Sequence, residues 1–215
     1  NGVIHCSADF DLFSLTNDSQ KQKTRKLLGL PNDSLVVRYL GSIGTWYLLE
    51  EMLDFFKRLK LKHPSAKFLF ITPTDEEEIM NIAKAKAIVS EDIVVKFAKR
   101  NEVADLMKAS DFSLFFIKPA YSKIASSPTK LGELFAMGLP VICNDKVGDV
   151  REIITQSQSG VLVETFTIES YDQAIESLPK YLDLAPRFIR SQSESYYQLD
   201  NAIQSYVEHY QSILS

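Results

Sequence analysis

The sequence predicts an α/β fold, a doubly wound sheet of six parallel strands flanked by helices. The first observation is a set of short runs rich in β-branched and aromatic residues, at 35–41, 67–72, 93–98, 112–117, 139–144 and 160–164. These runs are continuous rather than alternating, which is typical of parallel strands buried on both faces. The second observation is that helical patterns lie between the runs, so strands and helices alternate. The third is an ordinary globular composition, with 45% hydrophobic and 24% charged residues among 215.

The segments between the strands carry helix signals of their own. Residues 46–64 place apolar side chains on one stripe, and residues 75–89 begin with acidic residues that suit a helix N-terminus. Residues 101–110 start with a capping candidate, Asn101, and residues 147–158 stop before Gly160. Strands and helices in this order indicate a doubly wound sheet.

The two ends of the chain differ from the middle. We expect residues 1–15 to be an extended linker, residues 16–184 to form the α/β domain and residues 185–215 to form a C-terminal helical segment. Residues 16–29 read as a helix that Thr16 or Asn17 caps and Gly29 ends. The last helix, at 196–214, has an apolar stripe that is more typical of a core contact than of a partner surface.

Charge and composition exclude several classes of function. A net charge of −4 gives no basic surplus for a nucleic-acid partner, and no apolar run approaches the roughly 18 residues of a membrane span. The two cysteines are far apart, and no histidine has a second one at ligand spacing, so we expect no zinc site and a reducing, cytoplasmic setting. Because position 1 is Asn1 and no signal peptide is visible, we expect a piece of a longer protein or a processed product.

A glycine-containing loop, "GSIGTWY" at 41–47, follows the first strand. Ligands of doubly wound sheets bind beyond the carboxyl ends of the strands, and glycine lets the backbone approach a ligand closely. The loop is not a dinucleotide fingerprint, because the third glycine and the acidic residue at the next strand end are missing. A tight strand-to-helix turn is an equally open interpretation.

A second loop, "SSPTKLGELFAMGLPVI" at 126–142, leads from a loop into a helix and then a buried strand. Ser126 or Ser127 is a capping candidate, and Pro128 suits the first helical position. The amides of the next three residues, 129–131, should then remain free at a helix end, where phosphate binds readily.

The side chains of this helix sort into two faces. Thr129 and Glu133 are four residues apart and share a face, with Lys130 beside them, whereas Leu131 and its apolar neighbours face the core. A diphosphate would meet the amides, the Thr129 hydroxyl and Lys130, while Glu133 would reach vicinal ribose hydroxyls. A capped helix with a solvated Lys–Glu pair stays open as the alternative.

The stretch "SSPTKLGELFAMGLPVICND" resembles the donor-binding motif of the retaining GT-B glycosyltransferases of family 4, also called glycosyl transferases group 1. The resemblance extends to "NGVIHCSADFDLF" as an interdomain linker, to "RYLGSIGTWYLLEEMLDFF" as first strand, glycine loop and helix, and to "VGDVREIITQSQSGVLVE". These segments cover residues 1 to 164 in the family's order. The resemblance implies a Rossmann-like domain, the C-terminal half of a GT-B fold, that binds a nucleotide sugar.

The resemblance also implies roles for individual residues. Glu133 would bind the donor ribose, and Lys130 would act in catalysis by stabilising the leaving diphosphate. The remaining assignments are diphosphate binding by Gly44, Thr45, Ser127, Thr129, Lys130 and Leu131, and base binding by Ala98, Lys99 and Arg100. The family works without an essential metal or a cofactor, so Asp9 and Asp11 in the linker are not interpreted as metal ligands.

Two departures from the family pattern stand out. The family's first motif glutamate, which contacts the donor sugar, is replaced by Ala125. The glycine loop lacks the family's Arg and Lys, since Ser42 follows Gly41 and the aromatic residues Trp46 and Tyr47 stand near the lysine position. Lys130 is therefore expected to supply the missing positive charge.

The expected function is transfer of a sugar, with retention of configuration, from a UDP-sugar to a saccharide or lipid-linked acceptor in surface polysaccharide synthesis. The acceptor site would belong to a missing N-terminal domain, without which the chain would be inactive. We expect a cytoplasmic protein, with peripheral contact to the inner membrane through the full-length enzyme. The alternatives are a nucleotide-sugar epimerase of the same fold and a non-catalytic, degenerate glycosyltransferase module.

Overall fold

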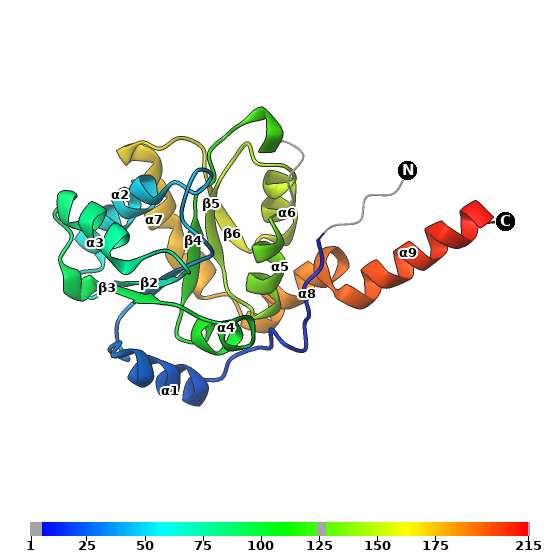
Figure 1. Ribbon diagram of the computed structural model, residues 1–215, viewed down its shortest axis with the longest axis horizontal. Helices are drawn as coiled ribbons and strands as arrows, with labels where there is room; N and C mark the ends of the chain where they lie inside the picture. Colours follow the sequence, from blue (N-terminus) through cyan, green and yellow to red (C-terminus); the bar gives the residue numbers. More distant parts are fainter. Residues whose placement is uncertain (1–5, 124–127, 215) are drawn as a thin grey trace.

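The structure is a computed structural model that describes residues 6–123 and 128–214. Its centre is one sheet of six strands, all parallel, in the order β3-β2-β1-β4-β5-β6 (Figure 1). The strands are β1 (Val36–Leu40), β2 (Lys67–Ile71), β3 (Ile93–Lys96), β4 (Phe112–Phe115), β5 (Val141–Asn144) and β6 (Gly160–Val163). Each lies within one of the six apolar runs, so the predicted doubly wound, Rossmann-like sheet is confirmed.

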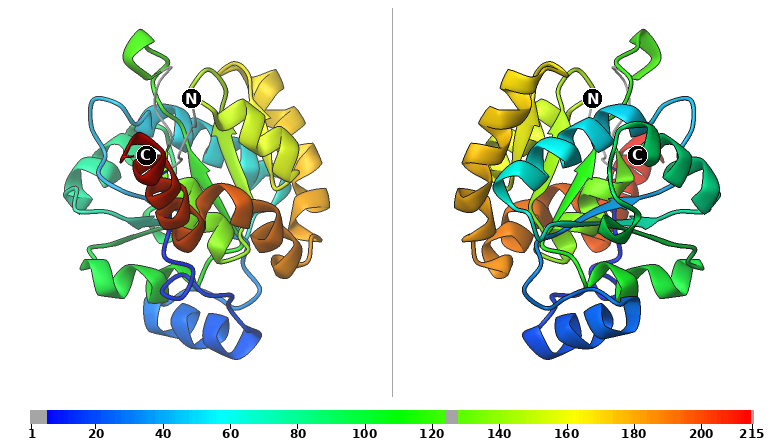
Figure 2. Two further views of the ribbon diagram at one scale, coloured as in Figure 1. Left: turned by 90° about the vertical axis from the view of Figure 1, so that its right-hand side faces the viewer. Right: turned by 90° about the vertical axis from the view of Figure 1, so that its left-hand side faces the viewer.

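Helices cover both faces of this sheet (Figures 1 and 2). They are α1 (Asp18–Leu28), α2 (Leu49–Lys62), α3 (Glu76–Ala85), α4 (Arg100–Met107), α5 (Thr129–Ala136), α6 (Val150–Ser157), α7 (Ile168–Leu182), α8 (Pro186–Tyr197) and α9 (Leu199–Leu214), with short 3-10 turns η1 (Ser90–Asp92) and η2 (Tyr121–Lys123). Helix α2 packs against α3 and α7, whereas α8 packs against α5 and α6. Among the described helices, none is both long and apolar enough to cross a bilayer.

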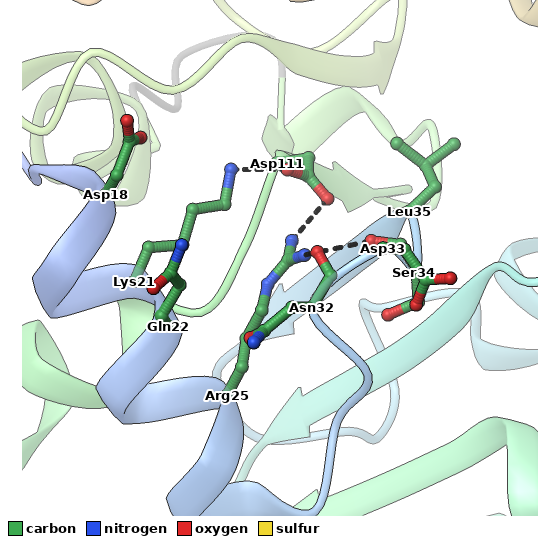
Figure 3. A pocket seen from close by; sticks show the side chains of 9 residues that line it. All are labelled: Asp18, Lys21, Gln22, Arg25, Asn32, Asp33, Ser34, Leu35 and Asp111. Carbon is green, nitrogen blue, oxygen red and sulfur yellow. Dashed lines mark hydrogen bonds and ion pairs between the residues drawn. The ribbon is translucent and has the colours of Figure 1, made fainter.

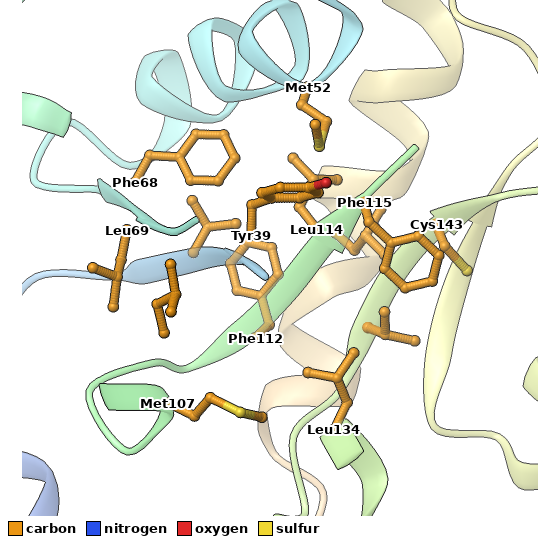
Figure 4. Close-up of a cluster of buried hydrophobic side chains, with 14 of the residues drawn as sticks. Tyr39, Met52, Phe68, Leu69, Met107, Phe112, Leu114, Phe115, Leu134 and Cys143 are labelled. Carbon is orange, nitrogen blue, oxygen red and sulfur yellow. The ribbon is translucent and has the colours of Figure 1, made fainter. Parts of the chain in front are cut away.

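The core fills the space between the sheet and these helices. Large aromatic side chains dominate it, and Tyr39, Phe68 and Phe112 are fully buried within it (Figure 4). Tyr39 and Phe70 pack with ring centroids 6.0 Å apart, and Phe68 and Phe70 at 4.1 Å. Burying one such side chain contributes about 1.5–3 kcal/mol, which explains why the strands read as continuous apolar runs.

The strand order reverses between β1 and β4, so the loops after these strands start side by side. Backbone bonds join the two loops: Leu48 N donates to Phe116 O at 3.0 Å, and Lys118 N donates to Trp46 O at 2.8 Å. An isolated antiparallel bridge also pairs Tyr47 with Ile117. Ligands of doubly wound folds bind at this type of reversal, which directs attention to the carboxyl edge of β1 and β4.

The N-terminal helix α1 begins and ends as its sequence predicts. Asn17 caps the helix and accepts a hydrogen bond from Gln20 N, and Gly29 ends it in the left-handed conformation with φ of 69°. The described part of the segment before it, residues 6–15, contains no helix or ladder strand. It packs on α8, where Arg190 donates to the carbonyl oxygens of Phe10 and Phe13.

The expectation that the last helix packs its apolar stripe into the core is wrong. The chain breaks at Gln198, and α9 projects away from the domain (Figure 1). The described stripe residues are each 43–65% exposed: Leu199, Ile203, Tyr206, Val207 and Tyr210. The pattern correctly predicts an apolar face, but no described element of the chain covers it.

Candidate functional site

Helix α5 follows β4 and its loop, and it begins at the carboxyl edge of the sheet. Pro128 is the N-cap of this helix, and no side chain caps the described helix start. The sequence placed Pro128 one position later, inside the first turn, and this was wrong because its ψ of 107° is extended. The capping candidates Ser126 and Ser127, with Ala125, lie outside the described residues.

The prediction of three free amides at this helix end also needs correction. Leu131 N donates to Pro128 O at 2.9 Å, so its amide already closes the first helical turn. Thr129 and Lys130, the first two helical residues, have no carbonyl four positions back within the helix. Thr129 is exposed, whereas Leu131 is fully buried and faces the core as predicted.

Lys130 reaches from α5 over the end of β1. Its Nζ donates to Leu40 O at 2.9 Å and lies 3.8 Å from the ring centroid of Tyr47, 4.9 Å from that of Tyr39 and 5.2 Å from that of Phe115. Burial of this ammonium lowers the pKa of Lys130 to about 7, with Arg38 adding to the effect. The amino group of Lys130 therefore lies in an aromatic cage, and its contacts within the described residues include no anion.

The glycine loop is shaped around this lysine. Gly41 has φ of 126°, and a Cβ on it would lie 3.4 Å from the Nζ of Lys130. A side chain at this position would be strained by the positive φ, although its Cβ would be only in ordinary contact with the ammonium. Gly44 and Thr45, which the sequence assigned to diphosphate binding, are exposed on the same loop.

Glu133 lies one turn further along α5 and is only 4% exposed. Its Oε1 pairs with Nη1 of Arg100 at 2.7 Å, and the Arg100 guanidinium lies 5.5 Å from the ring centroid of Phe13. The structure therefore brings the predicted ribose carboxylate together with one predicted base-binding residue. The other two, Ala98 and Lys99, precede α4, and Lys99 N donates to Glu102 at 2.8 Å.

Sequence reasoning missed Arg38, which sits in β1 and is fully buried. Burial lowers the pKa of Arg38 to about 9, and attraction to Glu133 opposes this. The signal was present, because an arginine in the middle of the apolar run "VVRYL" needs an explanation. One electrostatic cluster is thus formed by Arg38, Lys130 and Glu133. Arg100 joins it by pairing with Glu133 from the surface of the protein.

A separate polar cavity of about 350 Å³ opens beside α1 (Figure 3). Its two basic side chains share one carboxylate: Lys21 and Arg25 bind the two oxygens of Asp111 at 2.5 and 2.7 Å. Arg25 also donates to the carbonyl oxygens of Ala109, Asn32 and Ser34. This network joins α1 to the sheet, so the two cations of the cavity are already paired with a carboxylate.

Metal-binding side chains do not gather within residues 6–123 and 128–214, where no cluster of three or more His, Cys, Asp or Glu side chains suited to a metal ion occurs. Asp9 accepts hydrogen bonds from the amides of Asp11 and Leu12, so it stabilises a local turn.

Comparison with known proteins decides the family. The family model described as "Glycosyl transferases group 1" matches residues 20–192, which is well over half of the chain. The chain belongs to the group 1 glycosyltransferases. The match includes the glycine loop, the cluster around Lys130 and most of α8.

Curated relatives of this glycosyltransferase chain are distant. TuaC of Bacillus subtilis, whose name assigns it to teichuronic acid biosynthesis as a glycosyltransferase, is 28% identical over 74% of this chain and 36% of its own length. An uncharacterized glycosyltransferase of Haemophilus influenzae is 24% identical over 95% of this chain and 55% of its own. The chain thus spans between a third and a little over half of these relatives.

Solved structures show the same fold. HepE from Anabaena in complex with UDP superposes with a TM-score of 0.75 at 16% identity, over 98% of this chain and 57% of that one. Its complex with UDP-glucose gives 0.74 at 17% identity, over 98% and 57%. The C-terminal domain of LpcC, a group 1 family protein of Francisella tularensis, gives 0.65 at 20% identity, over 90% of this chain and all of that one.

Proposed function

We propose that this glycosyltransferase chain is the donor-binding half of a retaining enzyme and binds a nucleoside-diphosphate sugar at the carboxyl edge of β1 and β4. The observation that carries the proposal is the excess of positive charge there. Three basic side chains, Lys130, Arg38 and Arg100, interact electrostatically with a single carboxylate, Glu133. A buried excess of cations attracts an anion, and a diphosphate beside a helix N-terminus satisfies it.

The diphosphate would lie between the glycine loop and the start of α5. Lys130 would exchange part of its contact with Leu40 O for a phosphate oxygen, and the amides of Thr129 and Lys130 would point at the same group. Gly44 and Thr45 would cover it from the loop. The HepE structures, which contain UDP and UDP-glucose, support this class of ligand and favour UDP.

The nucleoside would lie toward α4. Glu133 would accept hydrogen bonds from the ribose hydroxyls, and the segment Ala98–Arg100 would frame the base. Because Arg100 already pairs with Glu133, it would mark the boundary between these two parts of the ligand. A buried carboxylate that accepts hydrogen bonds from two neighbouring hydroxyl groups gives specificity for a ribose.

Catalysis would depend on departure of the diphosphate. Negative charge develops on the leaving phosphate as the bond to the sugar breaks, and Lys130 with the helix-end amides would stabilise that charge. No side chain of the described cluster is a convincing nucleophile, so the leaving phosphate itself would assist attack from the same face, with retention. The acceptor, a saccharide or a lipid-linked one in polysaccharide synthesis, would bind a further domain of the full-length enzyme.

The proposal is tested by titrating the chain with UDP, GDP, ADP, UMP and pyrophosphate, with thermal unfolding and calorimetry as readouts. We expect UDP to bind and stabilise best, and UMP to bind at least tenfold more weakly because it lacks the second phosphate. Lys130→Met should remove most of this preference for UDP over UMP. Lys123→Met is the matched control, because it alters a lysine that lies over Trp46 on the same edge. This variant should keep the preference for UDP over UMP. Failure of every nucleoside diphosphate to bind would refute the proposal.

A further inference from the structure

Arg38 is an unusual buried arginine. It is fully buried, yet none of its three guanidinium nitrogens has a hydrogen-bond partner within the described part of the chain. Arg25, the other deeply buried arginine, donates to three carbonyl oxygens and to Asp111. Buried charges are normally paired in this second way, because an unpaired charge away from water is costly. The position of Arg38 therefore calls for a reason other than fold stability.

Strand geometry shows which side of the sheet Arg38 occupies. Successive residues of a strand point to opposite faces, and Tyr39 points toward Met52 of α2 (Figure 4). Arg38 consequently faces the opposite side, the one that carries α5 with Glu133. The charges of Arg38 and Glu133 attract each other across this interior, as do those of Lys130 and Glu133.

Besides Lys130, two arginines thus interact with Glu133: Arg100 at the surface (the upper one) and Arg38 in the interior (the lower one). The upper one, Arg100, has a side chain that is 70% exposed, so water and salt screen its attraction. A ribose must approach Glu133 from that open side and compete with Arg100 for the carboxylate oxygens. The lower one, Arg38, is shielded from water and keeps its attraction when Arg100 is displaced.

We propose that Arg38 is a positioning residue for nucleotide binding, whose buried charge holds the Glu133 carboxylate in place to accept ribose hydroxyls. The inference rests on the proposed function and adds a residue to it. Arg38 has no exposed surface at which a ligand could touch it, so its effect passes through Glu133. The carboxylate oxygens accept hydrogen bonds, which is what two hydroxyl donors require.

The test compares UDP with 2′,3′-dideoxy-UDP, which lacks both ribose hydroxyls, by calorimetry on the 215-residue chain. Arg38→Met should weaken UDP about tenfold and the dideoxy analogue less than about twofold, because only UDP uses Glu133. Arg38→Lys keeps the charge and should retain UDP affinity within about threefold. Equal losses for both ligands would overturn the proposal and indicate a phosphate contact or a structural role.

A double-mutant cycle separates the two residues. In a Glu133→Gln background, Arg38→Met should change UDP affinity by less than about twofold, since the carboxylate through which Arg38 acts is gone. A full tenfold loss in that background would overturn the proposal. If the unaltered chain binds neither nucleotide, the proposed function itself fails, and this inference fails with it.

Folding is followed alongside by circular dichroism and thermal unfolding. Arg38→Gln repeats every comparison with a neutral polar side chain of different shape. If Arg38→Met and Arg38→Gln both fail to fold, Arg38 serves the stability of the sheet and the proposal is overturned.

Discussion

Arg100 and Glu133 join α4 to α5 through a contact of 2.7 Å between Nη1 and Oε1. The first residue of one helix thereby touches a buried carboxylate of another, 33 positions later in the chain. The pair connects the loop proposed to frame the base with the side chain proposed to hold the ribose.

Glu133→Gln should weaken UDP binding roughly ten- to a hundredfold, equivalent to about 1.5–3 kcal/mol, because charge-assisted hydrogen bonds to the ribose are lost. Calorimetric titration of the folded variant measures this directly. Glu152→Gln removes an exposed carboxylate from the first turn of α6 and serves as the control. Unchanged UDP affinity in Glu133→Gln would remove Glu133 from the ribose site.

Arg100→Met should change the unfolding free energy by no more than about 1 kcal/mol, because its exposed guanidinium is screened by water. Arg25→Met, which strips Asp111 of its buried partner, should cost about 3–5 kcal/mol. Urea denaturation of both variants under the same conditions gives the comparison. Equal losses of unfolding free energy in the two variants would mean that the Arg100–Glu133 pair stabilises the fold.

The sheet was predictable because its strands are buried on both faces. A strand such as β1 or β4 must then be apolar along its whole length, and helices must separate such strands, so the pattern alone defines the fold. Gly29 and Asn17 were predictable for a similar reason, since helix ends have local requirements that single residues satisfy.

Contacts between distant segments were not predictable in this way. The sequence shows that Arg38 interrupts an apolar strand, but not that Glu133 lies on the same side of the sheet. It shows an apolar stripe on α9, but a stripe says only that one face is apolar and not what covers it. The aromatic cage around Lys130 was only partly predictable. Tyr47 stands out in the glycine loop, whereas Tyr39 and Phe115 look like ordinary core residues in the sequence.

Gly138→Ala should destabilise the chain much more than Gly29→Ala, although both glycines have nearly the same φ, 71° and 69°. The strain of a side chain at positive φ costs about 1 kcal/mol and is common to both. A Cβ at position 138 would also lie 2.6 Å from the backbone of Pro186, which begins α8, whereas nothing lies within 4 Å at position 29. Urea denaturation should therefore show an additional loss of about 1–3 kcal/mol for Gly138→Ala. Similar losses of unfolding free energy in Gly138→Ala and Gly29→Ala would mean that α8 can move to make room for the added Cβ.

Lys130 should make stability depend on pH above neutrality. Its pKa in the folded chain is about 7, below the ordinary value of 10.5. Between these values the unfolded chain binds a proton that the folded chain has released, so the unfolding free energy rises with pH. The difference between the unaltered chain and Lys130→Met should rise from pH 7 to pH 9.5 in urea denaturation. If this difference in unfolding free energy does not change with pH, the ammonium of Lys130 is well solvated in the folded chain.

Nucleotide binding should show the opposite dependence. A bound diphosphate favours the charged form of Lys130, so binding takes up a proton wherever the free chain has lost it. UDP affinity should therefore fall as pH rises from 7 to 9, and calorimetry in buffers of different ionisation enthalpy should detect the uptake. Lys130→Met should abolish both effects, and a proton uptake that persists in this variant would assign it to another group.

Lys130→Met in the full-length enzyme should separate catalysis from binding. Charge on the leaving phosphate is greater in the transition state than in the bound donor, so a cation that faces it contributes more to kcat than to donor affinity. We expect the barrier to rise by about 2–4 kcal/mol, a loss of roughly thirty- to a thousandfold in single-turnover transfer rate. Donor titrations should show a much smaller loss, and Lys123→Met should leave both quantities near those of the unaltered enzyme. Equal losses in rate and affinity would restrict Lys130 to ground-state binding, and an unchanged rate would leave leaving-group stabilisation to the amides that begin α5.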